Sequence, residues 1–272
     1  MKEYKCILCE SDNGKIFLIA SDRYNSSKEY KYFRCTNCNI VTLEDRTNNK
    51  NFEAYNLEEP SIIQKFILWM SYNKLRKYKK SGKVLDFGCG AGNLSFFLLK
   101  NGYNVNCFEI DPIYQEHLEK KGLNVLKKIS KDKYDIIVLD NVLEHLPNPI
   151  EVLKKLKKNL NDDGIFIISL PNINSLQFKI FKENWFHLDA PRHLNHFYKN
   201  SFSKLLERVN LNIIKKYYFN INIDPTGWWW SIKKSKNKIS LSEQIILGLF
   251  VPLVFITSIF KTTGQIIYII KK

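Results

Sequence analysis

Short apolar runs alternate with amphipathic segments from residue 83 to the end of the chain. Short apolar runs bounded by turn residues are typical of buried strands, whereas apolar positions three and four apart predict helices. Strands that alternate with helices in this way indicate an α/β fold with a mainly parallel sheet. We predict helices over 94–100, 113–120, 150–160 and 205–209, and strands over 83–87, 105–110, 124–126, 134–139, 165–170, 213–219 and 265–271.

The pattern before residue 82 is different. Two alternating stretches, Lys15–Ile19 and Tyr30–Arg34, predict short strands of a small module. A polar linker follows, and apolar positions at helical spacing after Pro60 predict a helix over 62–75. We therefore expect an amino-terminal module (1–43), a linker with a first helix (44–81) and a main domain (82–272).

An apolar insertion over about 228–262 interrupts the main domain. It contains Trp228-Trp229-Trp230, then a lysine-rich stretch, then the apolar run Ile245–Phe260. This run is shorter than the roughly 20 residues that a membrane-spanning helix needs. Tryptophans, lysines and an apolar helix together fit peripheral docking on an anionic membrane face. A buried helical hairpin or a dimer contact is an equal alternative.

Charge and composition exclude few classes of function. The 272 residues carry a formal net charge of +15, with 44% hydrophobic residues, which is ample for a core. A basic chain suits nucleic acid or an anionic membrane, but the lysines are spread through every segment. The first residues show no apolar signal-peptide region, so we expect a cytoplasmic protein, peripheral to the inner membrane face if the insertion docks there.

Four cysteines form two CxxC pairs in the amino-terminal module: Cys6 with Cys9, and Cys35 with Cys38. Four thiolates at this spacing can hold a structural Zn²⁺ ion in tetrahedral geometry, which predicts a zinc ribbon. A module this small buries little core, so the metal would supply folding energy. A redox dithiol is the weaker alternative. We expect the ribbon to pack on the main domain or its substrate side, with nucleic-acid contact as the other option.

A loop with glycine at every second position follows the first strand of the main domain. Asp86, Gly88, Gly90 and Gly92 lie between that strand and the next helix. Glycines allow positive φ angles and close approach of a ligand, so the loop predicts a nucleotide-like cofactor. Glu109 ends the next strand, 19 residues after Gly90, and its carboxylate can accept both hydroxyl protons of a ribose.

The spelling of this loop resembles motif I of the class I S-adenosylmethionine-dependent methyltransferases. The run 142–149 (VLEHLPNP) and the later strand with Pro171-Asn172 resemble the same family. The resemblance implies a Rossmann-like seven-stranded methyltransferase sheet, with a last strand antiparallel at its edge. It also implies S-adenosylmethionine as cofactor, with Asp140 and Asn141 at its amino-acid end. Glu144 and His145 either line the site or pack at a helix start, and the adenine contacts remain unassigned.

Three of the five histidines, His187, His193 and His196, lie within ten positions after the fifth strand, together with Asp189. Because histidine titrates near neutrality, His193 or His196 is the predicted group that takes a proton from a methyl acceptor. Arg192 could hold a carboxylate or phosphate of the acceptor. A structural loop whose histidines fill the core is an alternative, and a second zinc site is a less favoured one.

The segment around Pro191–Phe197 also looks like part of bacterial methyltransferases of saccharide and lipid-linked pathways. The leading hypothesis is therefore methyl transfer to a hydroxyl or carboxyl of a saccharide, a lipid-linked glycan or a small metabolite. Alternatives are an RNA methyltransferase that uses the ribbon and the lysines, and a non-enzymatic zinc-ribbon membrane adaptor. A nicotinamide oxidoreductase is disfavoured because Gly92 comes one position early for that fingerprint.

Overall fold

The computed structural model describes residues 4–22, 28–46, 57, 68–69, 76–129, 131–218, 224–233 and 241–272. The predicted helix over 62–75, most of the predicted linker and the lysine-rich stretch 234–238 lie largely outside these residues. The statements below concern the described part of the chain.

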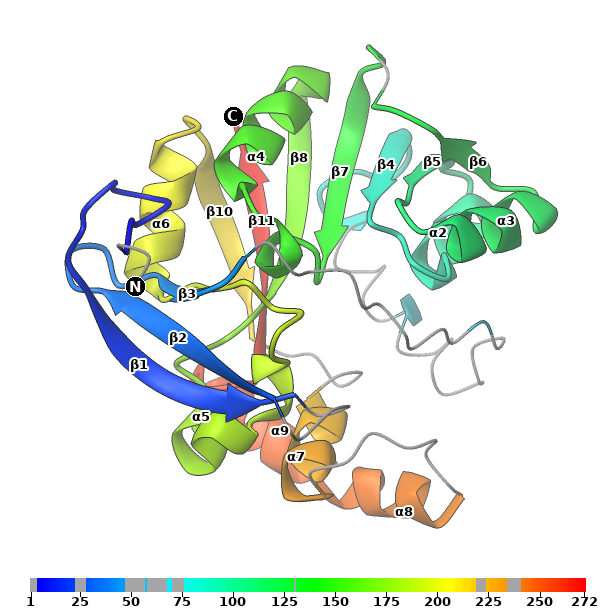
Figure 1. The fold of residues 1–272 in the computed structure, drawn as a ribbon. Coiled ribbons are helices and arrows are strands. Elements are labelled where there is room, and N and C mark those ends of the chain that lie inside the picture. The colour runs from blue at the N-terminus through cyan, green and yellow to red at the C-terminus, as the bar shows by residue number, and fades with distance from the viewer. Residues whose placement is uncertain are drawn as a thin grey trace.

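A seven-stranded mixed sheet forms the centre of the main domain and confirms the predicted α/β fold class (Figure 1). Five strands are parallel, and β11 runs antiparallel between β8 and β10. The last strand of the chain is thus one position inside the sheet, because β10 forms the edge. In sheet order the strands are β10 (Asn212–Tyr217), β11 (Gln265–Lys271), β8 (Leu160–Pro171), β7 (Tyr134–Asp140), β4 (Lys83–Phe87), β5 (Asn104–Phe108) and β6 (Asn124–Leu126).

Helices cover both faces of this sheet because the strand residues alternate between two cores. On β4, Val84 packs in one core with α2 (Asn93–Lys100) and α3 (Pro112–Lys120). Its neighbour Leu85 packs in the other core with α4 (Pro149–Asn159) and α6 (Lys199–Glu207). The second core also receives Leu8 and Ile40 of the amino-terminal module.

The amino-terminal module is a second, four-stranded sheet. It comprises β1 (Gly14–Ser21), β2 (Glu29–Cys35), β3 (Val41–Leu43) and β9 (Asn195–His196), paired antiparallel in that order. The fourth strand comes from the main domain, since Thr42 pairs with Asn195 and Val41 with His196. The two units therefore share one hydrogen-bonded sheet, which the residue pattern did not predict.

Some boundaries differ from the predicted ones. Strand β8 begins at Leu160, so it starts at the end of the helix predicted over 150–160 and five residues before the strand predicted over 165–170. The predicted apolar helix over 245–260 is two helices, α8 (Leu241–Leu249) and α9 (Val251–Ile259). Pro252 lies in the first turn of α9, where its missing N–H costs nothing, and a proline further inside a helix would break it.

The insertion between β10 and β11 forms a helical layer beside α5 (Leu176–Phe181). The tryptophans lie on α7 (Asp224–Lys233), where Trp228 is buried and stacks on Phe250. The Trp229 indole N–H donates to Glu243 at 3.1 Å. Trp228 is thus part of the core of this layer rather than an interfacial anchor. Within the described residues, none of the helices reaches the length and apolar character needed to cross a bilayer.

Candidate functional site

The glycine loop after β4 has the backbone that its sequence predicts. Gly88, Gly90 and Gly92 have φ angles of 75°, 53° and 76°, a region that favours glycine. A Cβ added at Gly88 would lie 2.6 Å from Val142, and one at Gly92 would lie 2.4 Å from Leu118. A Cβ at Gly90 would meet nothing within 4 Å, so the middle of the loop faces open space. The N–H groups of these three glycines donate within the protein, so what the loop offers a ligand is the open space at Gly90, where it can approach the backbone closely.

Glu109 lies against this loop, as the spacing predicts. Its Oε2 accepts the N–H of Gly90 at 2.9 Å, and its Oε1 accepts the N–H groups of Ile110 and Asp111. Strand β5 ends one residue earlier, at Phe108, whose carbonyl accepts the N–H of Gly88 at 2.7 Å. A carboxylate has about four lone-pair positions, so Glu109 retains acceptor capacity for a ribose hydroxyl.

Asp86 occupies the end of β4 and is 2% exposed. The Ser95 hydroxyl of α2 donates to its Oδ2 at 2.6 Å. Burial raises the pKa of Asp86 to about 7, against the opposing effect of the Ser95 hydrogen bond. The side chain thus ties the strand to the start of the following helix, and it lies at the edge where the glycine loop begins.

The Asp86 pKa predicts a pH-dependent stability. Between about pH 4 and 7 the folded chain binds a proton that the unfolded chain has lost, so the free energy of unfolding falls as pH rises. A difference between pKa values of about 7 and about 4 corresponds to roughly 4 kcal/mol. We expect Asp86→Asn to flatten this dependence in chemical denaturation between pH 4.5 and 7.5. Asp162→Asn, at an exposed position, should leave the pH dependence as in the wild type. Equal slopes of the free energy of unfolding against pH in the two variants would contradict the prediction.

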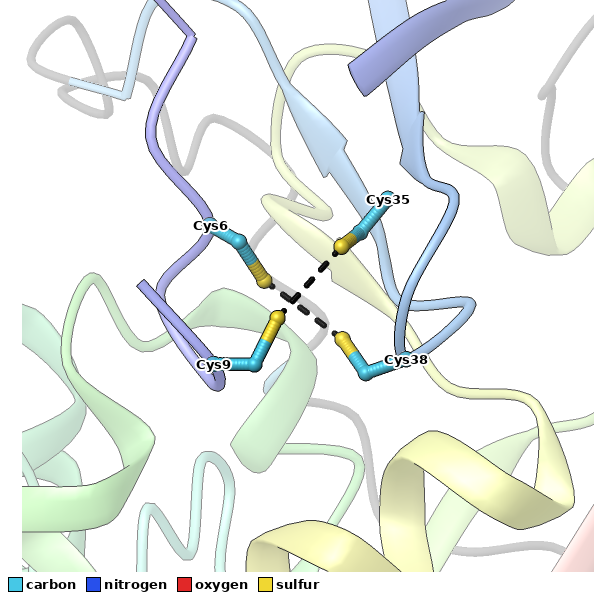
Figure 2. A group of neighbouring side chains, drawn as sticks. All are labelled: Cys6, Cys9, Cys35 and Cys38. Carbon is cyan, nitrogen blue, oxygen red and sulfur yellow. Dashed lines mark hydrogen bonds between the residues drawn. The ribbon is translucent and has the colours of Figure 1, made fainter. Parts of the chain in front are cut away.

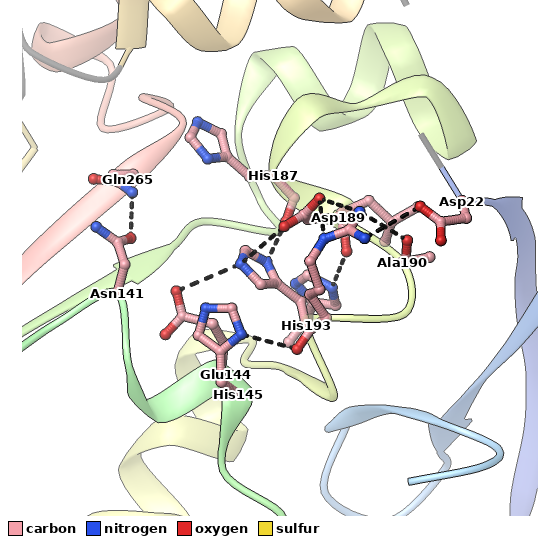
Figure 3. A network of polar contacts seen from close by, with 12 residues as sticks. Asp22, Asn141, Glu144, His145, His187, Asp189, Ala190, His193 and Gln265 are labelled. Carbon is pink, nitrogen blue, oxygen red and sulfur yellow. Dashed lines mark hydrogen bonds and ion pairs between the residues drawn. The ribbon is translucent and has the colours of Figure 1, made fainter. Parts of the chain in front are cut away.

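Asp140 and Asn141 end β7, beside β4 in the sheet. Asn141 has a φ of 55°, and its side-chain N–H₂ donates to Asp140 Oδ1 at 3.2 Å. Gln265 at the start of β11 donates to Asn141 Oδ1 at 2.5 Å (Figure 3). Because β7, β4 and β5 are parallel neighbours, these side chains share one sheet edge with the glycine loop and Glu109.

The histidine segment packs on the 3-10 turn η1 (Leu143–His145) that follows β7. The N–H of Leu194 donates to the carbonyl of Glu144 at 2.9 Å. His145 Nδ1 contacts the carbonyl of Arg192, also at 2.9 Å. These bonds bring residues about 50 positions apart into one cluster of Glu144, His145 and His193 (Figure 3).

The two histidines predicted to act in catalysis differ in their surroundings. His193 is 7% exposed, its Nδ1 contacts the carbonyl of His187 at 2.8 Å, and its Nε2 lies 4.0 Å from a Glu144 carboxylate oxygen. His196 lies deeper, beside Tyr32, with its Nε2 3.3 Å from the Leu188 carbonyl. Burial lowers the pKa of His193 well below its ordinary value and that of His196 to about 4.

Arg192, which the sequence offered as an anion-binding group, is engaged within the protein. Its guanidinium forms ion pairs with Asp189 at 2.8 Å and Asp22 at 3.2 Å, and its side chain is largely buried. Asp22 comes from the end of β1. The arginine therefore joins the histidine segment to the amino-terminal module.

The four cysteines of the CxxC pairs converge (Figure 2). The Cys6 and Cys38 sulfurs are 3.4 Å apart and the Cys9 and Cys35 sulfurs 3.5 Å, and none of these cysteines is in a disulfide. A zinc ion with Zn–S bonds of about 2.3 Å holds its sulfurs about 3.8 Å apart in a tetrahedron. The donor set therefore fits a structural zinc ion with little adjustment.

Sequence reasoning missed Tyr32 of β2. Its buried hydroxyl lies 2.9 Å from the carbonyl of His193 and 3.3 Å from that of Leu188, so the amino-terminal sheet supports the backbone of the histidine segment. These partners are 161 and 156 positions away along the chain. A contact this distant leaves no pattern in a single sequence.

Comparison with known proteins agrees with the geometry. The family model described as "Methyltransferase domain" matches residues 61–216, more than half of the chain. The ubiquinone biosynthesis O-methyltransferase of Actinobacillus pleuropneumoniae serotype 7 (strain AP76) is 31% identical over 107 residues, covering 33% of this chain and 46% of that protein. The enzyme of the same name from Ruegeria sp. (strain TM1040) is 27% identical over 168 residues, 55% and 67% of the two chains. The first of these matches thus spans about half of the curated relative.

Solved structures share the fold at low identity. A SAM-dependent methyltransferase from Archaeoglobus fulgidus has a TM-score of 0.52 and 19% identity, with 75% of this chain and 92% of that chain covered. Coclaurine N-methyltransferase bound to N-methylheliamine and SAH has a TM-score of 0.51 and 14% identity, with 80% and 74% covered. The glycine loop, the strand order and the family match together lead to one conclusion: the chain belongs to the methyltransferase domain family.

Proposed function

We propose that the chain transfers a methyl group from S-adenosylmethionine to an oxygen atom of its acceptor. The contact between Gly90 N–H and Glu109 at the common edge of β4 and β5 carries this proposal. It places a positive-φ glycine with open space above it beside a carboxylate suited to a ribose. The fold and the family match support the same activity.

The chain's own residues would hold the cofactor at this edge. The open space at Gly90 lets the cofactor approach the loop, Glu109 accepts from a ribose hydroxyl, and Asp140 with Asn141 lies at the amino-acid end. Asp86 fixes the start of the loop through Ser95. The cofactor, when bound, supplies a methyl group on a positively charged sulfur. The protein mainly brings the acceptor oxygen into line with it.

For the acceptor we propose a small metabolite with a hydroxyl group. The relatives are named ubiquinone biosynthesis O-methyltransferases, and that name supports oxygen as the atom methylated. A carboxyl acceptor, a saccharide and a lipid-linked glycan belong to the same chemical class of oxygen acceptors. The acceptor hydroxyl loses its proton beside the cluster of Glu144, His145 and His193, and the first two of these residues follow the end of β7. His196, with its Nε2 at the Leu188 carbonyl, has a positioning role behind His193.

The amino-terminal module is proposed to hold a structural zinc ion at its four cysteines. Its role is support of the site, since Tyr32 and Asp22 both contact the histidine segment from this module. Arg46 adds a third link, because its guanidinium donates to Asn195 of β9 at 3.0 Å.

We further propose peripheral contact of the α8–α9 layer with an anionic membrane. Among the side chains that the structure describes there, five large apolar ones are at least half exposed: Leu249, Phe255, Ile256, Ile259 and Phe260. Apolar side chains on a strongly basic chain fit such a surface. Sedimentation with vesicles that contain one third phosphatidylserine should pull down the protein, and Leu249→Ser with Phe260→Ser should reduce binding at least fivefold. Equal binding of the double variant would contradict this contact.

Calorimetry with S-adenosylhomocysteine tests the methyl-transfer proposal. One molecule should bind per chain, and the absence of binding to the folded protein would overturn the proposal. A screen of cell extract with a labelled methyl donor, read separately in metabolite, glycan, lipid and RNA fractions, then identifies the acceptor class. Label in the metabolite fraction is expected, and label in RNA alone would contradict the choice of acceptor.

A further inference from the structure

A buried carboxylate that has no hydrogen-bond partner in the described part of the chain lies beside the proposed methyl-transfer site, with His193 Nε2 4.0 Å from one of its oxygens. Glu144 is 0% exposed, and neither of its carboxylate oxygens has a hydrogen-bond partner among the described residues. A buried carboxyl group left in this state costs free energy whether it is charged or neutral, because both forms have hydrogen-bonding capacity to satisfy. The buried carboxylate therefore needs a partner that binds its oxygens.

Two imidazole rings face this carboxylate. The rings of His145 and His193 are 4.6 Å apart, and the two histidines and Glu144 each offer a donor atom within 4.8 Å of the others. Figure 3 shows the three side chains turned toward one another. His145 is the least buried of the three side chains.

The tautomers of both rings are set by backbone carbonyls. A carbonyl oxygen only accepts, so the contacts of His145 Nδ1 with Arg192 and of His193 Nδ1 with His187 require the proton on Nδ1. The lone pair of each ring then lies on Nε2. Histidines that bind metal ions commonly donate their other N–H to a carbonyl in this manner, which fixes the ring orientation.

We propose that Glu144, His145 and His193 bind one divalent ion of a first-row transition metal. Two imidazole nitrogens and one carboxylate are a donor set that suits such ions and leaves coordination positions for other ligands. Donors at about 2.1 Å from one ion lie within about 4.2 Å of each other, so small side-chain rotations complete the set. The ion meets the buried Glu144 oxygens, and the cysteine cluster is a separate site.

The role of this ion rests on the proposed function, although its binding does not. An acceptor hydroxyl bound to the ion releases its proton to solvent, because a metal ion stabilises the oxyanion. The oxygen then attacks the methyl carbon as the carbon–sulfur bond breaks, and sulfur keeps that electron pair. His193 in this arrangement acts as an ion ligand, and the proton leaves without passing to it.

Manganese binding to the full-length protein tests the site. The protein is first dialysed against a mild chelator until one zinc per chain remains, so that the cysteine cluster is filled. Titration with Mn²⁺, followed by the electron paramagnetic resonance of free Mn²⁺, should give one bound ion per chain. Spin-echo modulation of that ion should show nitrogen nuclei of imidazole. The proposal would be overturned if the wild type left the signal of free Mn²⁺ unchanged and showed no nitrogen modulation.

Matched variants locate the ion. Glu144→Gln and His145→Gln should each weaken Mn²⁺ binding at least tenfold, whereas Glu151→Gln, an exposed carboxylate on α4, should bind as the wild type does. Binding of S-adenosylhomocysteine serves as the folding control, since the glycine loop lies outside the cluster. Equal Mn²⁺ affinity in all three variants would overturn the site. If the wild type binds Mn²⁺ but no S-adenosylhomocysteine, the site stands and the proposed function fails.

Discussion

Replacing Cys38 with serine is expected to remove the zinc ion and to unfold the amino-terminal module. Its sulfur is buried and lies 3.4 Å from that of Cys6. Structural zinc supplies apparent binding free energies of about 10–16 kcal/mol in zinc-finger peptides, a large part of which is folding energy. Elemental analysis should find one zinc per wild-type chain and less than a tenth of that in Cys38→Ser. Thermal unfolding should begin at least 10 °C lower.

Cys89 provides the matched control. It is a partly exposed thiol in the glycine loop, away from the cysteine cluster. Cys89→Ser should keep its zinc, and a wild-type protein without zinc, or a Cys38→Ser variant with its full content, would refute the structural-zinc proposal. Because Tyr32 supports His193 from this module, the loss of zinc should also lower the rate of methyl transfer.

Replacing Glu109 with alanine is expected to weaken the binding of S-adenosylhomocysteine by about a hundredfold. A hydrogen bond from a ribose hydroxyl to a charged group contributes about 1.5–3 kcal/mol, which is roughly a ten- to hundredfold change in affinity. The change also leaves the N–H groups of Gly90, Ile110 and Asp111 without their acceptor, so the loop loses its preformed shape. Calorimetry measures both effects together as a lower affinity.

Two further variants separate these effects. Glu109→Gln retains an oxygen that can accept the N–H of Gly90. Its affinity for S-adenosylhomocysteine should lie between those of the wild type and Glu109→Ala. Glu119→Ala removes an exposed carboxylate on α3 that pairs with Lys127, and it should bind the ligand normally. Wild-type affinity in Glu109→Ala would place the ribose elsewhere.

The strand and glycine-loop predictions succeeded where a feature is local in sequence. The runs 134–139 and 265–271 are short and apolar, as is typical of buried strands, and both are strands in the structure. The glycine positions could be predicted because positive φ angles at three alternate positions, 88, 90 and 92, admit few other amino acids. The contact of Glu109 with this loop agrees with its spacing, and its role toward a ribose stays a prediction.

The parts that sequence reasoning missed depend on distant contacts. Strand β9 is two residues long and has no pattern of its own, because its pairing with β3 is what defines it. The sequence suggested that Arg192 could bind an anion of the acceptor. In the structure its guanidinium pairs with Asp22, 170 positions away along the chain. Trp228 looked interfacial because a helical run of tryptophans is ambiguous until its neighbours are known.

The shared sheet limits how this chain can be rebuilt. Residues 4–46 lie outside the segment that matches the family, yet β3 pairs with β9 inside it. A shortened version that starts after the linker would bare the edge of β9 and the carbonyl of His193 to water. A chimera that carries a foreign amino-terminal module would need residues 195–196 exchanged along with it.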